Sequence, residues 1–263
     1  MVRLACDGTR TATINSTNYS FAGVFGSDAV VLDASNYGAL YDTATASTSK
    51  SVTVSALALS GTDAANYTLV QPMLVGAINK ATATVIFSTP LSVVYDATSR
   101  AVGTTTTPSA LTVVVQYSGR GATSFATSTT GPIDAGNYGV AASINETNYL
   151  GTNAADFTIE KQLLPVALET AALTTTFTGR ARFVAATTMP LGKQVGVLYQ
   201  GSGSTTYAAS TYAPTNAGTY AVTATIEERN FQGTSTQTLT VAKANQETLS
   251  IVNTAPVVYG DTT

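Results

Sequence analysis

Residues 214–226 read PTNAGTYAVTATI, and residues 132–144 read PIDAGNYGVAASI. Pro, Ala, Gly and Tyr recur at one constant spacing, as Tyr138 and Tyr220 show (220 − 138 = 82). After the tyrosine, apolar residues alternate with small or polar ones, which is the period of a half-buried strand. The stretch therefore predicts a Gly turn followed by a β-strand, present twice in the chain.

The duplication extends well beyond this stretch. Between Lys80 and Lys243, 28 of 82 positions are identical at the same offset, several times what a shared composition would give. We therefore predict two copies of one fold with no gap between them, and name them repeat 1 (80–161) and repeat 2 (162–243).

Two further segments flank the repeats. Residues 244–263 contain Val-Val-Tyr-Gly-Asp at 257–261, which matches the opening of a repeat. They are predicted to be the first strands of a truncated third repeat, so the sequence is interpreted as part of a longer array. Residues 1–79, named the N-module, contain motifs similar to those of the repeats but do not match the repeats at the 82-residue offset. We expect a related but distinct module whose N-terminus is either complete or truncated.

Composition and charge exclude several classes of protein. Asp, Glu, Lys and Arg make up only 10% of the 263 residues, 44% are hydrophobic, and the polarity comes largely from 48 Thr, so the chain can fold. Histidine is absent, which excludes Ser-His-Asp catalysis and two-His zinc sites. A net charge of −3 with scattered basic residues gives no footprint for nucleic acid. The single Cys6 excludes an internal disulfide, and no apolar run reaches the ~18 residues of a membrane span.

The pattern of apolar residues predicts an all-β chain. Val113, Val115 and Tyr117 alternate with other residues, clusters of Gly, Pro, Asn and Asp separate such runs, and no segment keeps a helical spacing over three turns. We expect tandem immunoglobulin-like β-sandwich modules arranged as an elongated array, with β-grasp-like modules as the alternative. In the N-module the apolar phase changes after Val54, which predicts a bulge or turn near Ser55-Ala56.

The repeats resemble the MBG domains of large bacterial surface proteins of the filamentous-haemagglutinin-like adhesin type. The residues that carry this resemblance are PTNAGTY at 214–220, ATI at 224–226, NFQG at 230–233 and LTVAK at 239–243. The N-module resembles the companion YDG domain, with CDGT at 6–9 in place of the usual YDGT and SGTDAANYTL at 60–69. The resemblance implies a secreted, cell-surface, repetitive protein, and it implies no catalytic residues.

Two repeated motifs could carry chemistry but favour a structural interpretation. A tyrosine after a Gly turn at the head of a strand, as at Tyr138 and Tyr220, is typical of the tyrosine corner of β-sandwiches. Asp134 in repeat 1 becomes Asn in repeat 2, an exchange that a metal ligand or acid catalyst would not survive. Glu146 and Glu228 are equivalent, and each is predicted to lie at a solvated hairpin tip.

The remaining motifs also favour structure. Each module ends in a lysine, namely Lys80, Lys161 and Lys243. A repeated Lys-Asn isopeptide bond is not expected, because the residue equivalent to Asn145 in repeat 2 is a Glu. Lysines that blunt an exposed strand edge are the better interpretation. The paired glycines at 119 and 121, and at 201 and 203, predict a hairpin rather than a phosphate cradle, since no helix follows.

Two functions remain open at this point. The first is a non-enzymatic stalk segment of a secreted adhesin, which presents a binding region away from the cell. Its partners are the neighbouring repeats of the same chain, and it has no catalytic, metal or cofactor residues and no nucleic-acid partner. The second is direct binding of host glycan or protein, which needs an exposed aromatic cluster such as Tyr117, Phe125, Tyr199 and Tyr207.

Overall fold

The computed structural model describes residues 3–246 and 249, and it confirms an all-β fold of sandwich modules, with 45% of residues in strands and 2% in helices. The chain divides into two compact units. The first contains the residues up to Val93 together with Ala97–Ile159, and the second contains Val94–Asp96 and the residues from Glu160 onward. The predicted third repeat lies outside the described residues, apart from 244–246 and 249.

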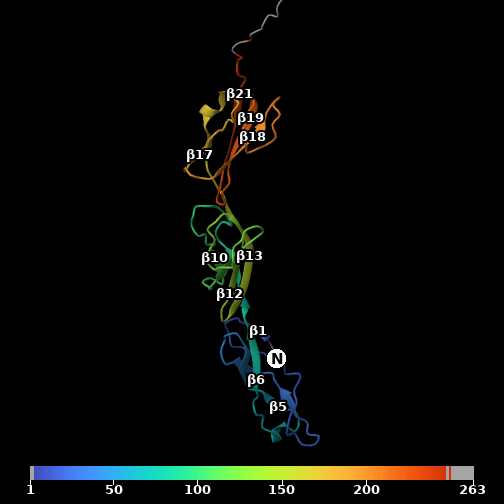
Figure 1. Ribbon diagram of the computed structural model, residues 1–263. Coiled ribbons are helices and arrows are strands. Elements are labelled where there is room, and N and C mark those ends of the chain that lie inside the picture. The colour runs from blue at the N-terminus through green and yellow to red at the C-terminus, as the bar shows by residue number, and fades with distance from the viewer. Residues whose placement is uncertain (1–2, 247–248, 250–263) are drawn as a thin grey trace, which may run out of the picture. The chain divides into compact units, whose positions relative to one another are not determined.

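The N-module combines a four-stranded sheet of order β1-β6-β4-β3 with a two-stranded sheet of β2 and β5 (Figure 1). After β4, Ala56 adopts a left-handed φ of 57°, so the turn predicted near Ser55-Ala56 is confirmed. The elements are β1 (Arg3–Ala5), β2 (Val31–Asp33), β3 (Gly38–Tyr41), β4 (Ser47–Ser55), β5 (Ala58–Ser60), the 3-10 turn η1 (Ala64–Asn66) and β6 (Met73–Asn79).

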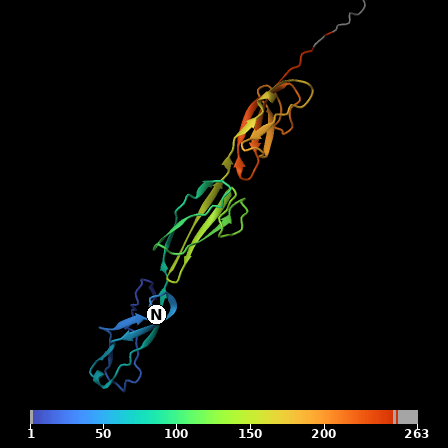
Figure 2. The ribbon, with the colours of Figure 1, turned by 90° about the vertical axis from the view of Figure 1, so that its left-hand side faces the viewer.

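Repeat 1 is built around the long hairpin of β12 and β13 (Figure 2). Strand β11 pairs with β12, while β7 and β9 both pair with β13, and β8 and β10 form a separate two-stranded sheet. The strands are β7 (Ala81–Thr82), β8 (Thr84–Phe87), β9 (Ser92–Val94), β10 (Thr104–Thr107), β11 (Val114–Gly119), β12 (Gly136–Asn145) and β13 (Tyr149–Glu160).

Repeat 2 has the same plan. Its main sheet has the order β16-β21-β19-β18, and two-stranded sheets join β15 to β17 and β14 to β20. The elements are β14 (Gln162–Leu163), β15 (Val166–Leu168), η2 (Thr170–Ala172), β16 (Thr174–Thr176), β17 (Ala186–Thr188), β18 (Val195–Gly201), β19 (Gly218–Ile226), β20 (Phe231–Gln232) and β21 (Thr234–Ala242).

The two repeats share strand registers as well as strand order. Tyr117 lies opposite Val140 in repeat 1, and Tyr199 lies opposite Val222 in repeat 2, so both members of the pair are displaced by 82 residues. Because register fixes which face of a strand is buried, the sequence repeat corresponds to a repeat of the core.

The predicted gap-free match is wrong at one place. Strand β7 begins at Ala81 and β14 at Gln162, a difference of 81, although the residues they pair with are 82 apart. By Leu91 and Leu173 the difference is 82 again, since their carbonyls accept N–H groups from residues 82 apart in β13 and β21. One residue is therefore inserted before Leu173, where repeat 2 forms the turn η2.

The N-module has the main sheet of the repeats. Its order β1-β6-β4-β3 corresponds to β16-β21-β19-β18, and in both sheets the opening strand runs parallel to the closing strand. Directly after the opening strand, Cys6, Tyr95 and Phe177 each donate a main-chain N–H to the carbonyl of the residue before a module-closing lysine, namely Asn79, Glu160 and Ala242. Cys6 therefore occupies the position of an aromatic residue in the repeats, as the sequence predicts.

Each module encloses a small core of aliphatic and tyrosine side chains. In repeat 2 the buried cluster includes Tyr199, Tyr220 and Leu239, and in the N-module it includes Tyr41 and Val52. Burial of such side chains stabilises a fold by roughly 1.5–3 kcal/mol each. No helix in the described part of the chain is long and apolar enough to cross a membrane.

Candidate functional site

Tyr138 and Tyr220 are core residues, as predicted. Their side chains are 1% and 2% exposed. Each hydroxyl donates a hydrogen bond to the main-chain carbonyl four residues earlier, that of Asp134 at 2.6 Å and that of Asn216 at 2.7 Å. Burial, together with the nearby Tyr207, raises the pKa of the Tyr220 hydroxyl. Because the acceptor is a main-chain oxygen, Asp and Asn can exchange there without loss of the bond.

The aromatic residues suggested for ligand binding do not form an exposed cluster. Tyr117 and Tyr199 are each 2% exposed, and their hydroxyls accept the main-chain N–H located 15 residues earlier, at 2.7 and 2.9 Å. Phe125 and Tyr207 are half-buried and pack edge-on against the corner tyrosines, with ring centroids 5.5 Å apart. The four residues therefore lie in the cores of the modules or pack against them, and the prediction that they form an exposed cluster is wrong.

The repeated glutamates tie the central hairpin to a neighbouring loop. The carboxylate of Glu146 accepts the N–H of Thr112, and that of Glu228 accepts the N–H of Gln194 at 2.9 Å. The side chain of Glu228 is only 25% exposed, with the Lys193 Nζ at 3.6 Å, so the predicted solvated tip is wrong there. The hydrogen bond from Thr112 lowers the pKa of Glu146. Near neutral pH this group is a fixed acceptor and not a proton donor.

Two of the module-closing lysines, Lys80 and Lys161, bind the same hairpins. Lys80 Nζ donates to Oδ1 of Asn145 at 2.7 Å, and Lys161 Nζ donates to the main-chain carbonyl of Glu228 at 2.9 Å. The structure thus brings together the Lys and Asn that an isopeptide bond would join. The adjacent carboxylate, Glu146, has a lowered pKa and cannot supply the un-ionised acid that amide formation needs. The contact is a hydrogen bond between the start of the repeat and its hairpin.

The paired glycines form tight hairpins, as predicted. A Cβ on Gly119 or Gly201 would lie 2.1 Å from the carbonyl oxygen of Thr123 or Thr205. The glycines two residues later adopt left-handed φ angles of 59° and 62°. Both positions therefore require glycine for reasons of backbone geometry.

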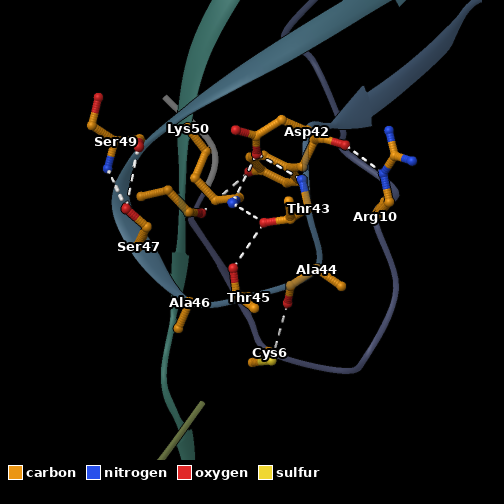
Figure 3. Close-up of polar contacts among 12 residues, drawn as sticks. Cys6, Arg10, Asp42, Thr43, Ala44, Thr45, Ala46, Ser47, Ser49 and Lys50 are labelled. Carbon is orange, nitrogen blue, oxygen red and sulfur yellow. Dashed lines mark hydrogen bonds and ion pairs between the residues drawn. The ribbon is translucent and has the colours of Figure 1, made fainter. Parts of the chain in front are cut away.

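The N-module contains a polar cluster that the sequence analysis missed (Figure 3). Lys50, on β4, has a side chain that is only 5% exposed. Its Nζ lies 2.8 Å from Oδ1 of Asp42 and donates to Oγ1 of Thr43 at 2.5 Å. Nearby, Arg10 Nε donates to the carbonyl of Tyr41 at 2.7 Å. A buried ammonium needs such partners, because an unpaired charge in a protein interior is strongly destabilising.

Lys50 occupies the position of the corner tyrosine. It precedes Val52 by two residues as Tyr220 precedes Val222, and each valine lies opposite the buried tyrosine of the neighbouring strand. In the repeats, a long loop precedes this position and supplies the carbonyl that binds the tyrosine hydroxyl. In the N-module only residues 42–46 separate β3 from β4. The ion pair with Asp42 therefore closes this end of the core in place of the corner.

The charges of this cluster favour a structural role. The hydrogen bond from Lys50 lowers the pKa of Asp42, and the N–H of Thr43 adds to the effect. Asp42 is thus ionised at neutral pH and is not the un-ionised acid that an amide bond to Lys50 would need. Among the residues that the structure describes, no group of three Cys, Asp or Glu side chains could hold a metal ion.

A groove of about 600 Å³ lies beside β6 in the N-module. Apolar side chains such as Leu57, Leu69 and Leu74 line it, together with Tyr19 and Phe21, whose rings are 5.2 Å apart. Its volume is in the range of small-ligand sites, roughly 300–1,000 Å³. No sequence pattern predicts this groove, because much of its wall is the irregular segment 12–21, which has no periodic pattern.

Comparison with protein families identifies both kinds of module. The MBG domain family matches residues 81–163 and 166–245, and the YDG domain family matches residues 6–73. The chain is an MBG/YDG-domain repeat protein. MBG and YDG domains occur in bacterial surface repeat proteins, which places this MBG/YDG-domain chain among proteins of that general kind. No curated protein matches the chain.

Proposed function

We propose that this MBG/YDG-domain chain is a stalk segment of a large secreted bacterial adhesin, which presents a binding region away from the cell surface. One observation supports this proposal. The repeated tyrosines and glutamates form hydrogen bonds within their own modules. The corner tyrosines hold a loop carbonyl, and the glutamates hold a loop N–H. A role of this kind needs no catalytic residue and no cofactor, and its first partners are the neighbouring repeats.

Exchange between equivalent positions supports this role. Cys6, Tyr95 and Phe177 share one position, and Lys50 replaces the corner tyrosine in the N-module. A ligand would constrain the chemistry of its contact residues, whereas a core position constrains mainly volume and hydrogen bonding. The pattern of exchange is the one expected for positions under structural constraint.

Direct binding of host glycan or protein is the second candidate. The observation that favours it is the groove beside β6, since aromatic and apolar side chains with a few polar neighbours are typical of ligand sites. The groove is found in the N-module, so binding through it would not use the duplicated part of the chain.

Small-angle scattering in dilute solution tests the stalk proposal. A compact globule of 263 residues has a radius of gyration of roughly 18 Å. We expect a clearly larger value, and we expect a variant that lacks residues 162–243 to lose length rather than cross-section. A radius close to the compact value would overturn the proposal. Glycan-array or host-protein binding that Leu74→Asp abolishes would instead support the second candidate.

A further inference from the structure

The tips of the two central hairpins lie beside the places where the preceding modules end. We name residues 145–149 the tip of repeat 1 and residues 227–231 the tip of repeat 2. At each tip the main-chain carbonyl of an asparagine, Asn148 or Asn230, accepts the first N–H of β7 or β14, at 2.8 and 2.9 Å. Both of these strands begin directly after a module-closing lysine. The main-chain framework around the two tips is therefore the same.

In the second unit this framework brings two aromatic rings together. Tyr95 belongs to repeat 1 by sequence, but it lies in the second unit with its two chain neighbours. Its N–H donates to the carbonyl of Glu160 at 2.9 Å, and only Lys161 separates that residue from Gln162, which pairs with Phe231. The rings of Tyr95 and Phe231 meet edge-on, with centroids 5.4 Å apart and an interplanar angle of 86°. This is a preferred geometry for an aromatic pair.

The ring at the tip of repeat 2 is oriented by a neighbouring charge. Lys193 Nζ lies 3.7 Å from the centroid of Phe231 and 3.6 Å from Oε2 of Glu228. Its side chain is only 22% exposed, so both interactions are partly shielded from water. The same carboxylate accepts the N–H of Gln194 at 2.9 Å, which fixes its own position. Phe231 is thus preorganised for contact with Tyr95, and less side-chain freedom is lost when the two rings meet.

The first unit has the same framework with different side chains. Cys6 takes the place of Tyr95, because each donates its N–H to the carbonyl of the residue before a module-closing lysine. Tyr149 takes the place of Phe231, 82 residues earlier in the chain. The thiol of Cys6 donates to the carbonyl of Ala44 at 3.4 Å, and this position has no ring to offer a tip.

The tip of repeat 1 makes a polar contact instead. Oδ1 of Asn148 accepts the main-chain N–H of Ala46, in the turn between β3 and β4 of the N-module, at 2.9 Å. The bond joins residues 102 positions apart and is partly buried. Leu111 stands where repeat 2 has Lys193, so the charge that orients a ring is missing as well. One tip thus contacts a main-chain amide, and the other contacts an aromatic ring.

We propose that the tip of each central hairpin is a recognition surface for the module that precedes it in the chain, specific for an aromatic ring in repeat 2 and for a main-chain amide in repeat 1. Tyr95 is then the residue that repeat 2 recognises, although it lies outside residues 162–243. Because the two tips differ, each favours its own neighbour over the other. These contacts lie within the chain, so they go beyond the proposed stalk function and do not depend on it.

Hydrogen exchange of the full chain, followed by mass spectrometry, tests the tip of repeat 2. The reporters are the amides of Gln162 and Leu164, whose N–H groups bond carbonyls at or next to the tip. Tyr95→Ala should speed their exchange by about 2- to 12-fold, the range that corresponds to the interaction of an aromatic pair. Tyr95→Phe keeps the ring and should change exchange by less than about twofold.

A double-mutant cycle isolates the contact between the rings. Once Phe231→Leu has removed the ring of the tip, adding Tyr95→Ala should have little further effect on the reporters, because the partner is gone. The matched control is Cys6→Ala at the equivalent position of the N-module, which should leave exchange at Ala81 and Ala83 unchanged. Reporters that do not respond to Tyr95→Ala, or that respond equally with and without the ring of Phe231, would overturn the assignment of this tip.

The tip of repeat 1 is tested through the amide of Ala46. Asn148→Ala should speed its exchange by about 2- to 12-fold, as expected for the loss of one hydrogen bond, whereas Asn148→Asp keeps an acceptor oxygen and should not. Each alanine variant should affect only its own tip. An effect of Tyr95→Ala at Ala46, or of Asn148→Ala at the reporters of repeat 2, would indicate a general loss of stability and would overturn the proposed specificity. The stalk proposal can fail in scattering without changing any of these results.

Discussion

Substitution of the corner tyrosine of repeat 2 separates a hydrogen bond from the packing of a ring. Tyr220→Phe keeps a side chain that is 2% exposed and removes the 2.7 Å bond to the carbonyl of Asn216. A typical intramolecular hydrogen bond contributes about 1 kcal/mol net, so we expect that loss in the free energy of unfolding. Tyr220→Ala also removes the ring that packs edge-on with Tyr207. Large-to-small changes of buried aromatic residues cost about 3–5 kcal/mol.

Urea denaturation followed by circular dichroism measures both changes. In thermal unfolding, which is a second readout, a loss of 1 kcal/mol in a module of about 80 residues corresponds to a fall of roughly 4–8 °C in melting temperature. The matched variant is Tyr138→Phe in repeat 1, which removes a bond of nearly equal length, 2.6 Å. The control is Tyr212→Phe, because that side chain is 82% exposed and should change stability by less than about 0.5 kcal/mol.

The structural interpretation makes two claims that these variants can refute. A Tyr220→Ala variant as stable as the parent would show that the ring is a surface contact, and the ligand-binding candidate would gain. A difference of more than about 1 kcal/mol between Tyr138→Phe and Tyr220→Phe would contradict the equivalence of the two registers, since equal geometry should give equal loss.

Three further substitutions test other parts of the fold. Lys50→Met should cost about 1–2 kcal/mol less than Lys50→Ala in N-module unfolding, since methionine fills the buried volume without a charge, and equal losses would contradict this. The pKa of Asp42 is lower in the folded protein than in the unfolded chain, so its ionised carboxylate adds to the free energy of unfolding above the unfolded pKa of about 3.9. That stabilisation is lost as pH falls through the lower folded pKa, so Asp42→Asn should flatten the dependence of unfolding on pH in this range. Gly119→Ala should destabilise repeat 1 by about 1–3 kcal/mol in chemical denaturation, because its Cβ would lie 2.1 Å from a carbonyl oxygen.

The sequence predicts the repeated core well because the alternating pattern and the 82-residue offset describe the same residues. It misses the inserted residue because no position from 80 to 90 is identical at that offset. The short strands β7 and β8 and their counterparts β14 and β15 need only alternate apolar and other residues, so their residue identities are free to change while their packing stays the same. Only the strand registers reveal the offset of 81 there.

One misplacement and one omission could have been avoided by considering the phase of the strand first. Tyr117 shares its phase with Val113 and Val115, which already indicates the buried face, yet its position near a Gly hairpin suggested exposure. Lys50 shares its phase with Val52 and Val54 in the same way. A lysine in the buried phase of a strand is thus a signal in itself, although its partner Asp42 can be found only from the fold.

The distribution of shared and unshared features shows where a ligand should be sought. The corner position accepts Tyr or Lys, and the position after the opening strand accepts Cys, Tyr or Phe. Such exchange is compatible with a core and incompatible with recognition of one ligand at every module. The groove beside β6 is found in the N-module, and its wall lies outside the duplicated part of the chain. A binding function shared by all the modules would therefore use their outer surfaces, where exposed aromatic residues such as Tyr212 are the natural first targets for substitution.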